Sequence, residues 1–189
     1  MLVLTVALSA GLIAGYALGG RLGNLERLHL RLPWLVVLAL AVQLVIFSPL
    51  GEPLGETAVV ALHLASYGLL IAFAVANRRD IGVFVAGIGI LLNTTVIAAN
   101  EGFMPASATA LEMSGRAAAA EPHNNSALAD AGARLLPLGD VMAVPDWVPL
   151  VANVFSVGDV LIAAGVTVML ATGMRAPAAG DQVPAARAP

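Results

Sequence analysis

Residues 57–100 read TAVVALHLASYGLLIAFAVAN-RRD-IGVFVAGIGILLNTTVIAAN, two uncharged runs on either side of three charged residues. The runs, 57–77 and 81–100, contain 21 and 20 residues. A helix rises about 1.5 Å per residue, so about 20 residues cross a hydrocarbon core of roughly 30 Å. This stretch therefore predicts a helical hairpin that crosses a membrane twice.

The rest of the chain extends the pattern to five predicted membrane spans. Further apolar runs cover residues 1–20, 32–50 and 155–174. The 189 residues are 59% hydrophobic and 11% charged, whereas soluble domains carry about 25% charged residues. This composition excludes an ordinary soluble domain and a disordered chain. We expect an all-α, polytopic integral membrane helix bundle with five transmembrane helices.

Outside the spans we expect two further segments. The outer loop, residues 101–154, is predicted to form turns and short helices at the membrane interface, where Trp147 would be favoured. The bundle and this loop make up residues 1–174, and residues 175–189 are expected to be a disordered cytoplasmic tail, because they are rich in Ala and Pro.

The arginines predict the orientation. Seven of the nine fall in the loops after the first and third spans and in the tail: Arg21, Arg27, Arg31, Arg78, Arg79, Arg175 and Arg187. Such loops lie on the cytoplasmic side of a membrane. We therefore expect a multi-pass protein of the bacterial plasma membrane, with its N-terminus outside and its C-terminus in the cytoplasm.

Partners and cofactors follow from charge and composition. The lipid bilayer is the expected partner, other membrane protein subunits stay open as partners, and a net charge of −3 does not favour nucleic acid. The chain has no cysteine, so it has no disulfide, thiolate metal site or cysteine nucleophile. His29 and His123 fall on opposite sides of the predicted membrane, which excludes a three-histidine metal site. We expect neither a metal nor a cofactor.

Two patterns within the spans suggest helix contacts. Glycines at four-residue spacing, Gly11, Gly15, Gly19 and Gly23, form a stripe on one helix face, which allows close packing on another span or on another protein. His63 is the ionisable residue near the middle of a span. Such groups are candidates for function, but the simpler interpretation is a neutral histidine that hydrogen-bonds Gln43 or Asn93 on a neighbouring helix.

Two outer-face carboxylates, Asp140 and Asp159, are the candidate catalytic residues. Two aspartates that share a proton can act as acid and base on a water molecule. A structural role is the alternative for each residue. Ser156 and Asp159 match the capping-box pattern of a helix start, and Leu138-Gly139-Asp140 fits a turn.

Asn100, Gly102 and His123 are the candidate binding residues. Asn100 and Gly102 suit a left-handed turn at a helix end, and Pro105 prevents the helix from continuing. We expect residues 100–105 to fold back against the start of the last span and bury Phe103 and Met104 there. Asn100 would then donate a hydrogen bond to Asp159.

Residues Phe155-Ser-Val-Gly-Asp159, with Ile162 and Gly165 after them, resemble the last motif of the lipoprotein signal peptidases (signal peptidase II). In that family the aspartate of this motif is one of two catalytic aspartates, and the other lies upstream. Here Asp140 precedes Asp159 by 19 residues. The resemblance implies an aspartyl peptidase with Asp140 and Asp159 as its catalytic pair.

Other features of that family are matched less well. Asn100-Glu101-Gly102 is similar to its outer-face Asn-x-Gly motif. Val141, however, stands where the family has an arginine, and no predicted span separates the Asn-x-Gly motif from the aspartates. The resemblance covers about 30 of the 189 residues.

A second resemblance covers the whole chain. Five predicted spans, Asn100-Glu-Gly-Phe-Met-Pro105, Leu138-Gly-Asp140 and Phe155-Ser-Val-Gly-Asp159 resemble an uncharacterised bacterial membrane family, a domain of unknown function. That family implies no activity.

Three functions remain as hypotheses. The small size and the glycine stripe favour a non-catalytic scaffold or an accessory subunit of a membrane complex. The paired carboxylates favour an outer-face aspartyl hydrolase, acting on a lipid-linked peptide or lipoprotein. A small transporter is the third, which a continuous polar tunnel through Gln43, His63 and Asn93 would favour. Whether the protein is an enzyme stays open.

Overall fold

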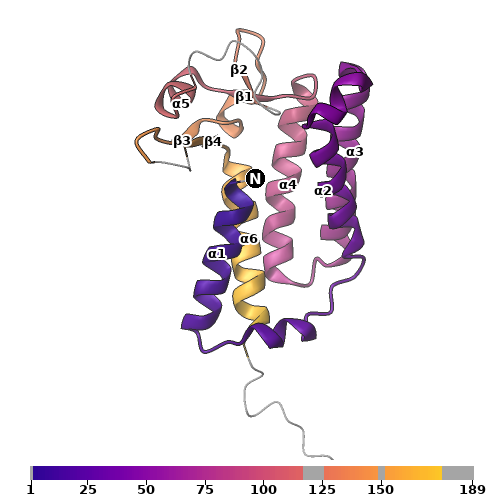
Figure 1. Ribbon diagram of the computed structural model, residues 1–189, viewed down its shortest axis with the longest axis vertical. Helices are drawn as coiled ribbons and strands as arrows, with labels where there is room; N and C mark the ends of the chain where they lie inside the picture. The colour runs from indigo at the N-terminus through magenta and orange to yellow at the C-terminus, as the bar shows by residue number, and fades with distance from the viewer. Residues whose placement is uncertain (1, 117–125, 149–151, 176–189) are drawn as a thin grey trace, which may run out of the picture.

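The computed structural model describes residues 2–116, 126–148 and 152–175. Five helices form a bundle, and a small cap lies over one end of it (Figure 1). The bundle helices are α1 (Leu2–Ala17), α2 (Trp34–Ile46), α3 (Glu56–Ala76), α4 (Ile81–Ala99) and α6 (Val157–Gly173). The predicted disordered tail falls on residues outside this description, apart from Arg175.

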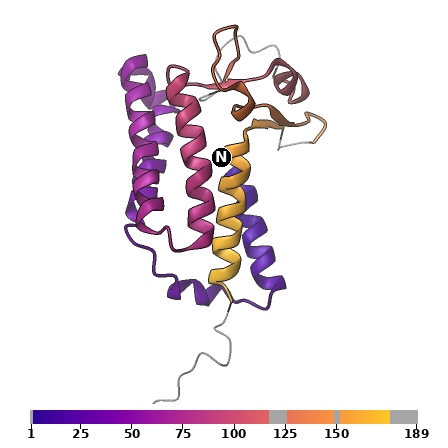
Figure 2. The same cartoon turned by 180° about the vertical axis from the view of Figure 1, so that it is seen from behind.

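The bundle helices are not arranged in chain order. α1 packs against α6, α6 against α4, α4 against α3, and α3 against α2. Figures 1 and 2 show this row from opposite sides, with the first and last helices next to each other. The last helix therefore fills the place between α1 and α4.

Glycines bring α4 and α6 into close contact. Gly82 and Gly89 on α4, and Gly158 and Gly165 on α6, are spaced seven residues apart on each helix. A methyl group at Gly89 would collide with the Gly158 carbonyl and the Ile162 backbone. A methyl group at Gly165 would likewise collide with backbone atoms of α4. The two backbones approach each other closely because these four contact positions carry no side chain.

The predicted glycine stripe of α1 also lies against α6, in its first half. A methyl group at Gly11 would meet Leu170, and one at Gly15 would meet Met174. Gly19 and Gly23 lie beyond the end of α1, and a methyl group there would meet nothing within 4 Å. The glycine stripe therefore packs on another helix of the same chain, which is one of the two predicted partners.

The prediction of five transmembrane helices is not supported. By length and composition, α3 and α4 are the described helices that could cross a membrane. α1, α2 and α6 are apolar but have 16, 13 and 17 residues, and 13 residues span only about 20 Å. The lengths of the uncharged runs overestimate the lengths of these helices, because turns rich in Gly, Pro and Ser are also uncharged.

The boundaries of α2 illustrate this error. The predicted span covered residues 32–50, but Pro33 precedes the first helical residue, and Pro49 begins the 3-10 helix η2 (Pro49–Leu54). Proline lacks the backbone N–H that an α-helix interior needs. Both ends of the uncharged run therefore lie outside the α-helix.

The cap contains strands, which were not predicted. β1 (Met104–Ala106) pairs in parallel with β2 (Ser126–Leu128), and β3 (Met142–Val144) pairs antiparallel with β4 (Asn153–Phe155). The short helices α5 (Ala108–Met113) and η3 (Leu136–Leu138) lie between these strands along the chain, and Trp147 is exposed. Strands of three residues are too short to show the alternation of polar and apolar residues that identifies a strand.

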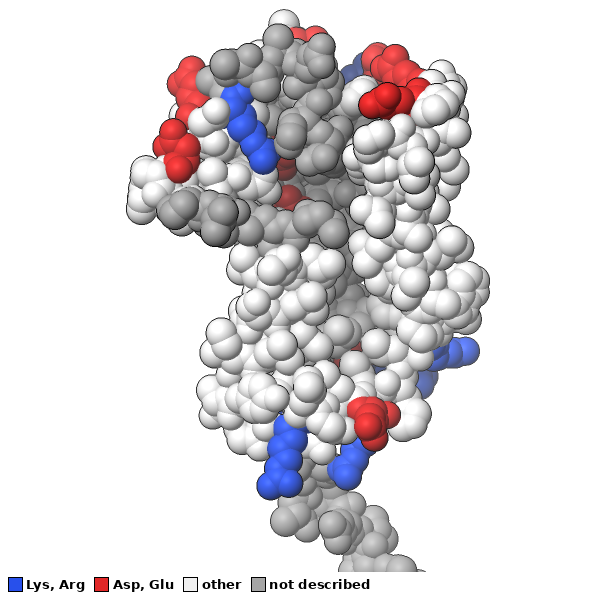
Figure 3. All heavy atoms as spheres, in the orientation of Figure 1, with Lys and Arg blue, Asp and Glu red and all other residues white. Residues whose placement is uncertain are grey.

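The cap is joined to the bundle through an apolar cluster. Tyr67, Ile90, Val96, Ile97 and Met104 are buried together, so α3 and α4 contact the first strand of the cap. Charged side chains gather at the two ends of the molecule and leave a broad uncharged band between them, on the face that Figure 3 shows.

Candidate functional site

A cavity of about 510 Å³ lies between the cap and the ends of the helices. Its polar lining residues are Gln43, Ser48, His63, Tyr67, Asn93, Arg116, Ser126, Asp140, Asn153 and Asp159. Its apolar lining residues include Val3, Leu40, Ala41 and Leu44 of α1 and α2. Figure 3 shows this face hollowed below the cap, with acidic atoms deep in the hollow. The candidate catalytic residues Asp140 and Asp159 thus line one cavity.

Backbone hydrogen bonds to β1 fix the position of Asp140. Its N–H donates to the Pro105 carbonyl at 2.9 Å, and its carbonyl accepts from the Ser107 N–H at 3.1 Å. Asp140 also forms a parallel bridge with Ala106, so it lies beside β1 like a strand residue. β2 lies beside β1 as well, and this small sheet brings Ser126 close to Asp140.

The Asp140 carboxyl group is buried, with 4% of the residue exposed. The Ser126 hydroxyl donates a hydrogen bond to Asp140 Oδ2 at 2.5 Å. Burial raises the pKa of Asp140 to about 6, because a charged carboxylate is poorly solvated there. The Ser126 hydrogen bond opposes this rise, the negative charge of Asp159 adds to it, and Arg116 lowers the pKa slightly.

Asp159 is half-buried in the first turn of α6 and accepts two hydrogen bonds. The Ser156 N–H donates to Asp159 Oδ2 at 3.1 Å, and the Asp159 N–H donates to Ser156 Oγ at 3.0 Å. These two bonds form the capping box that the sequence predicts. The Asn93 amide on α4 donates to the other oxygen, Oδ1, at 2.9 Å.

Asn93 closes a ring of hydrogen bonds around the start of α6. Ser156 Oγ donates to Asn93 Oδ1 at 2.9 Å, while Asn93 Nδ2 holds Asp159. Both Asn93 and Ser156 are buried. A methyl group at Gly158 would collide with Asn93, so the glycine contact of α4 and α6 makes this ring possible.

Each aspartate therefore combines a structural role with a carboxyl group that lines the cavity. Asp159 caps α6 and also lines the cavity. Asp140 directly follows η3 and Gly139, and its carboxyl group faces the same space. A structural role does not remove either carboxyl group from the cavity.

Asn100 does not hydrogen-bond Asp159, and that prediction is wrong. Asn100 Nδ2 donates to the carbonyls of Val96 and Arg134, at 2.7 and 2.9 Å, and Asn100 Oδ1 accepts from the Arg134 N–H at 2.7 Å. Asn93, two helical turns earlier on α4, makes the bond that was predicted for Asn100. Asn100 instead fixes a loop of the cap to the end of α4.

The turn after α4 is left-handed, as predicted. Glu101 and Gly102 have φ angles of +56° and +96°. Met104 is buried in the apolar cluster against which Ile162 of α6 packs, whereas Phe103 is half-buried and lines a separate surface hollow. The segment therefore folds back toward α6 through Met104.

The candidate binding residues do not meet in the cavity. Gly102 packs beside Val60 of α3. His123 lies outside the described residues. Neither Asn100 nor Gly102 lines the cavity that holds the two aspartates.

The predicted partners of His63 are also corrected. The Gln43 amide donates to Ser66 Oγ at 2.9 Å. The His63 ring contacts the rings of Phe47 and Tyr67, with centroids 4.9 and 5.2 Å apart. His63 is thus a buried ring of the cavity wall.

Sequence reasoning missed several residues of the site. Tyr67 lines the same cavity, where the negative charges of Asp159 and Asp140 act on its hydroxyl. Ser126 showed no signal, because its three-residue strand could not be recognised. Asn93 did give a signal, as a polar residue in an apolar run, but its partner lies 66 residues away. Among the described residues, no group of three or more His, Cys, Asp or Glu side chains could hold a metal ion.

Comparison with known families adds one finding. The model of a family of unknown function, DUF5317, matches residues 27–171, which is more than half of the chain. The chain belongs to this family. Comparisons with curated proteins and with solved structures found no match.

The DUF5317 region includes nearly all of the candidate site. It runs from the end of η1 (Leu22–Arg27) almost to the end of α6, and it contains both aspartates and Asn93. α1 lies outside it and contributes Val3 to the cavity lining. The expected membership in an uncharacterised family is confirmed, and the DUF5317 family itself supplies no activity.

Proposed function

We propose that this DUF5317 protein is an integral membrane protein whose cap-side cavity is an acid–base hydrolytic site. One observation carries the proposal: two carboxyl groups from different elements line one cavity in opposite surroundings. Asp140 is buried with a pKa of about 6, and Asp159 accepts two hydrogen bonds from Asn93 and Ser156. Environments that differ in this way separate an acid from a base.

The exposed surface supports a position in the membrane. Ile13, Val37 and Leu44 are 70%, 67% and 67% exposed, on α1 and α2. Apolar patches of this extent are unusual on soluble monomers. The distribution of arginines favours a cytoplasmic location for the end opposite the cap, so the cap and the cavity face outward.

The two carboxyl groups suit hydrolysis of an ester or amide. Asp159 would take a proton from a water molecule as its oxygen attacks the carbonyl carbon of the substrate. Asp140, protonated through its raised pKa, would give its proton to the leaving oxygen or nitrogen as the scissile bond breaks. The water supplies the hydroxyl group of the new acid, and a proton returns from Asp159 to Asp140 through solvent.

The cavity wall favours a substrate with an apolar part. Leu40, Ala41 and Leu44 of α2 and Val3 of α1 form one side, and the carboxyl groups form another. A lipid-linked peptide has both an apolar part and a polar part. The likeness to the lipoprotein signal peptidases points to the same substrate class, although Val141 differs from the arginine of that family.

Hydrolysis of a defined probe tests the proposal. The purified full-length protein is mixed in detergent with a diacylated peptide that carries a fluorophore and a quencher. We expect cleavage by the wild type and a loss of roughly 10²-fold or more in Asp140→Asn and Asp159→Asn. Asp146→Asn, at an exposed cap position, is the matched control and should keep full activity. Cleavage that survives in both cavity variants would refute the proposal.

A scaffold or accessory subunit is the second candidate function. α2 packs on α3 and leaves Trp34, Val37 and Leu44 more than half exposed, and a partner subunit could cover this face. Isolation in mild detergent followed by native mass spectrometry distinguishes the candidates: a stoichiometric partner supports the scaffold, and a clean monomer contradicts it. Transport is not proposed, because the lining residues of the cavity lie in the cap or between the cap and the middle of the helices.

A further inference from the structure

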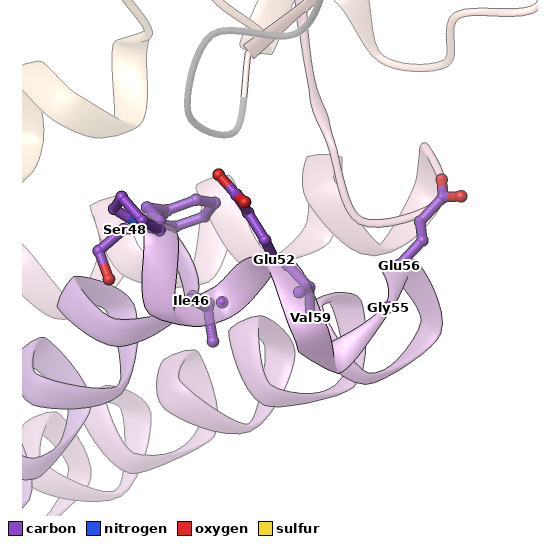
Figure 4. A pocket seen from close by; sticks show the side chains of 9 residues that line it. Ile46, Ser48, Glu52, Gly55, Glu56 and Val59 are labelled. Carbon is purple, nitrogen blue, oxygen red and sulfur yellow. The ribbon is translucent and has the colours of Figure 1, made fainter.

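A second hollow lies beside the cavity, at the end of α2 (Figure 4). It has a volume of about 420 Å³ and is bounded by η2 and the first turn of α3. Glu52 and Glu56, both exposed, are its charged lining residues. In Figure 4 the Glu52 side chain extends over the hollow, whereas Glu56 points away from it.

Phe47 and Ser48 line both spaces. These two residues therefore form the partition between the acidic hollow and the cavity of the two aspartates. Phe47 is half-buried, and its ring meets the His63 ring edge-on, at 4.9 Å and an interplanar angle of 87°. His63 belongs to the cavity wall, so the Phe47 ring lies across the boundary of the two spaces.

The backbone at this partition is fixed, whereas the ring is held mainly by packing. The Phe47 N–H donates to the Gln43 carbonyl at 3.1 Å, and Ser48 Oγ donates to the Val45 carbonyl at 2.9 Å. The Phe47 side chain could therefore change its rotamer without movement of the helix. Rotamer changes of partly exposed side chains are fast compared with a catalytic turnover.

We infer that the acidic hollow is the aqueous entrance to the two-aspartate cavity and that Phe47 is its gate. Small polar species, water and cations above all, pass Phe47. The apolar wall formed by α1 and α2 lies on another side of the same cavity. Glu52 and Glu56 concentrate cations at the entrance and repel anions, because charges that line a cleft raise the local concentration of the opposite charge. This inference goes beyond the proposed function and does not require that the protein is a hydrolase.

Thiol modification tests the gate, since the natural chain has no cysteine. Single cysteines are introduced in the full-length protein at Ser126→Cys or Asn153→Cys, which both line the cavity. Their rates of reaction with a cationic and an anionic methanethiosulfonate are measured in detergent. We expect the cationic reagent to react about tenfold faster than the anionic one. Two cysteine positions keep the test valid if one variant does not fold.

Changes at the partition should alter these rates in a specific way. Phe47→Ala should accelerate both reagents several-fold, and Phe47→Trp should slow them. Leu44→Ala is the matched control, because Leu44 lies three residues before Phe47, in the last turn of α2, and lines the cavity but not the acidic hollow. A cysteine at Leu50, which is 72% exposed and lines neither space, should react at the same rate with and without Phe47→Ala.

The charge of the entrance is tested separately. The double change Glu52→Gln and Glu56→Gln should abolish the preference for the cationic reagent, while Glu101→Gln, on the other surface hollow, should preserve it. The inference is overturned if Phe47→Ala leaves both cavity cysteines unchanged, if Leu44→Ala accelerates them equally, or if both reagents react at the same rate. None of these measurements needs hydrolysis. Their outcome is therefore independent of the activity measured for Asp140→Asn and Asp159→Asn, which tests the proposed function.

Discussion

The two carboxyl groups of the cavity differ in what surrounds them. Within the described part of the chain, Asp140 is almost fully buried and accepts one side-chain hydrogen bond, from Ser126, whereas Asp159 is half-buried and accepts two. Sequence alone predicted both residues, because an aspartate is conspicuous in an apolar stretch. It could not predict their surroundings, since Ser126 and Asn93 reach them from segments distant in the chain.

Asp140 should make the stability of the protein fall with rising pH. Its folded-state pKa, about 6, lies above the ordinary value of 3.8. Between these values the native protein still holds the proton that the unfolded chain has lost. The free energy of unfolding should therefore decrease by roughly 3 kcal/mol as the pH rises from about 4 to above 6.

Thermal unfolding of the detergent-purified protein at pH 4 and pH 7.5 measures this effect. Asp140→Asn keeps an oxygen for the Ser126 hydroxyl but cannot ionise. It should be more stable than the wild type at pH 7.5 and similar to it at pH 4. An equal difference at both pH values would show that ionisation of Asp140 is not the cause.

Asn93 should matter for stability as well as for the site. Asn93→Leu removes the amide that serves both Asp159 and Ser156, and it leaves two polar groups without their partner. We expect a loss of about 1–3 kcal/mol in the free energy of unfolding. Thr95→Val on the same helix is the control and should cost much less, because the Thr95 hydroxyl donates to the Leu91 carbonyl within its own helix.

The elements show where sequence patterns succeed and where they fail. All five predicted runs contain a helix, because long uncharged apolar stretches rarely form anything else. The predicted runs extend beyond the α-helices, since the residues that follow α1 and α2, such as Gly19, Gly20 and Ser48, carry no charge either. The four-residue glycine spacing of α1 was recognised, whereas the seven-residue spacing that joins α4 to α6 was overlooked.

The contact of α4 and α6 should be sensitive to a single methyl group. Gly89→Ala would press against the Gly158 carbonyl and the backbone of Ile162, and overpacking of this kind costs about 1–3 kcal/mol. Gly68→Ala on α3 is the matched control, because a methyl group there meets nothing within 4 Å. That variant should be unchanged or slightly more stable, since alanine favours helix over glycine by about 1 kcal/mol. A lower melting temperature for Gly68→Ala than for Gly89→Ala would contradict this account of the contact.

For the whole molecule, the orientation in the membrane is the main testable proposal. Cells that produce an Asp146→Cys or an Arg79→Cys variant are treated with a membrane-impermeant maleimide. Both positions are exposed, the first on the cap and the second between α3 and α4. The cap cysteine should react in intact cells, and the other should react only after the membrane is permeabilised. The reverse pattern would place the cavity on the cytoplasmic side.

The neighbouring positions of α1 and α6 have a consequence for biosynthesis. A ribosome releases α1 first, yet its packing partner α6 begins about 140 residues later, at Val157. In the proposed membrane location, the glycine faces of α1 and α4 therefore stay uncovered during translation, and both are covered when the last helix packs between them. A chain that stops before Val157 would expose both faces to quality-control proteases. Conversely, α1 produced as a separate peptide should still find its place on a chain that begins near residue 27, because its docking surface is complete without a covalent link.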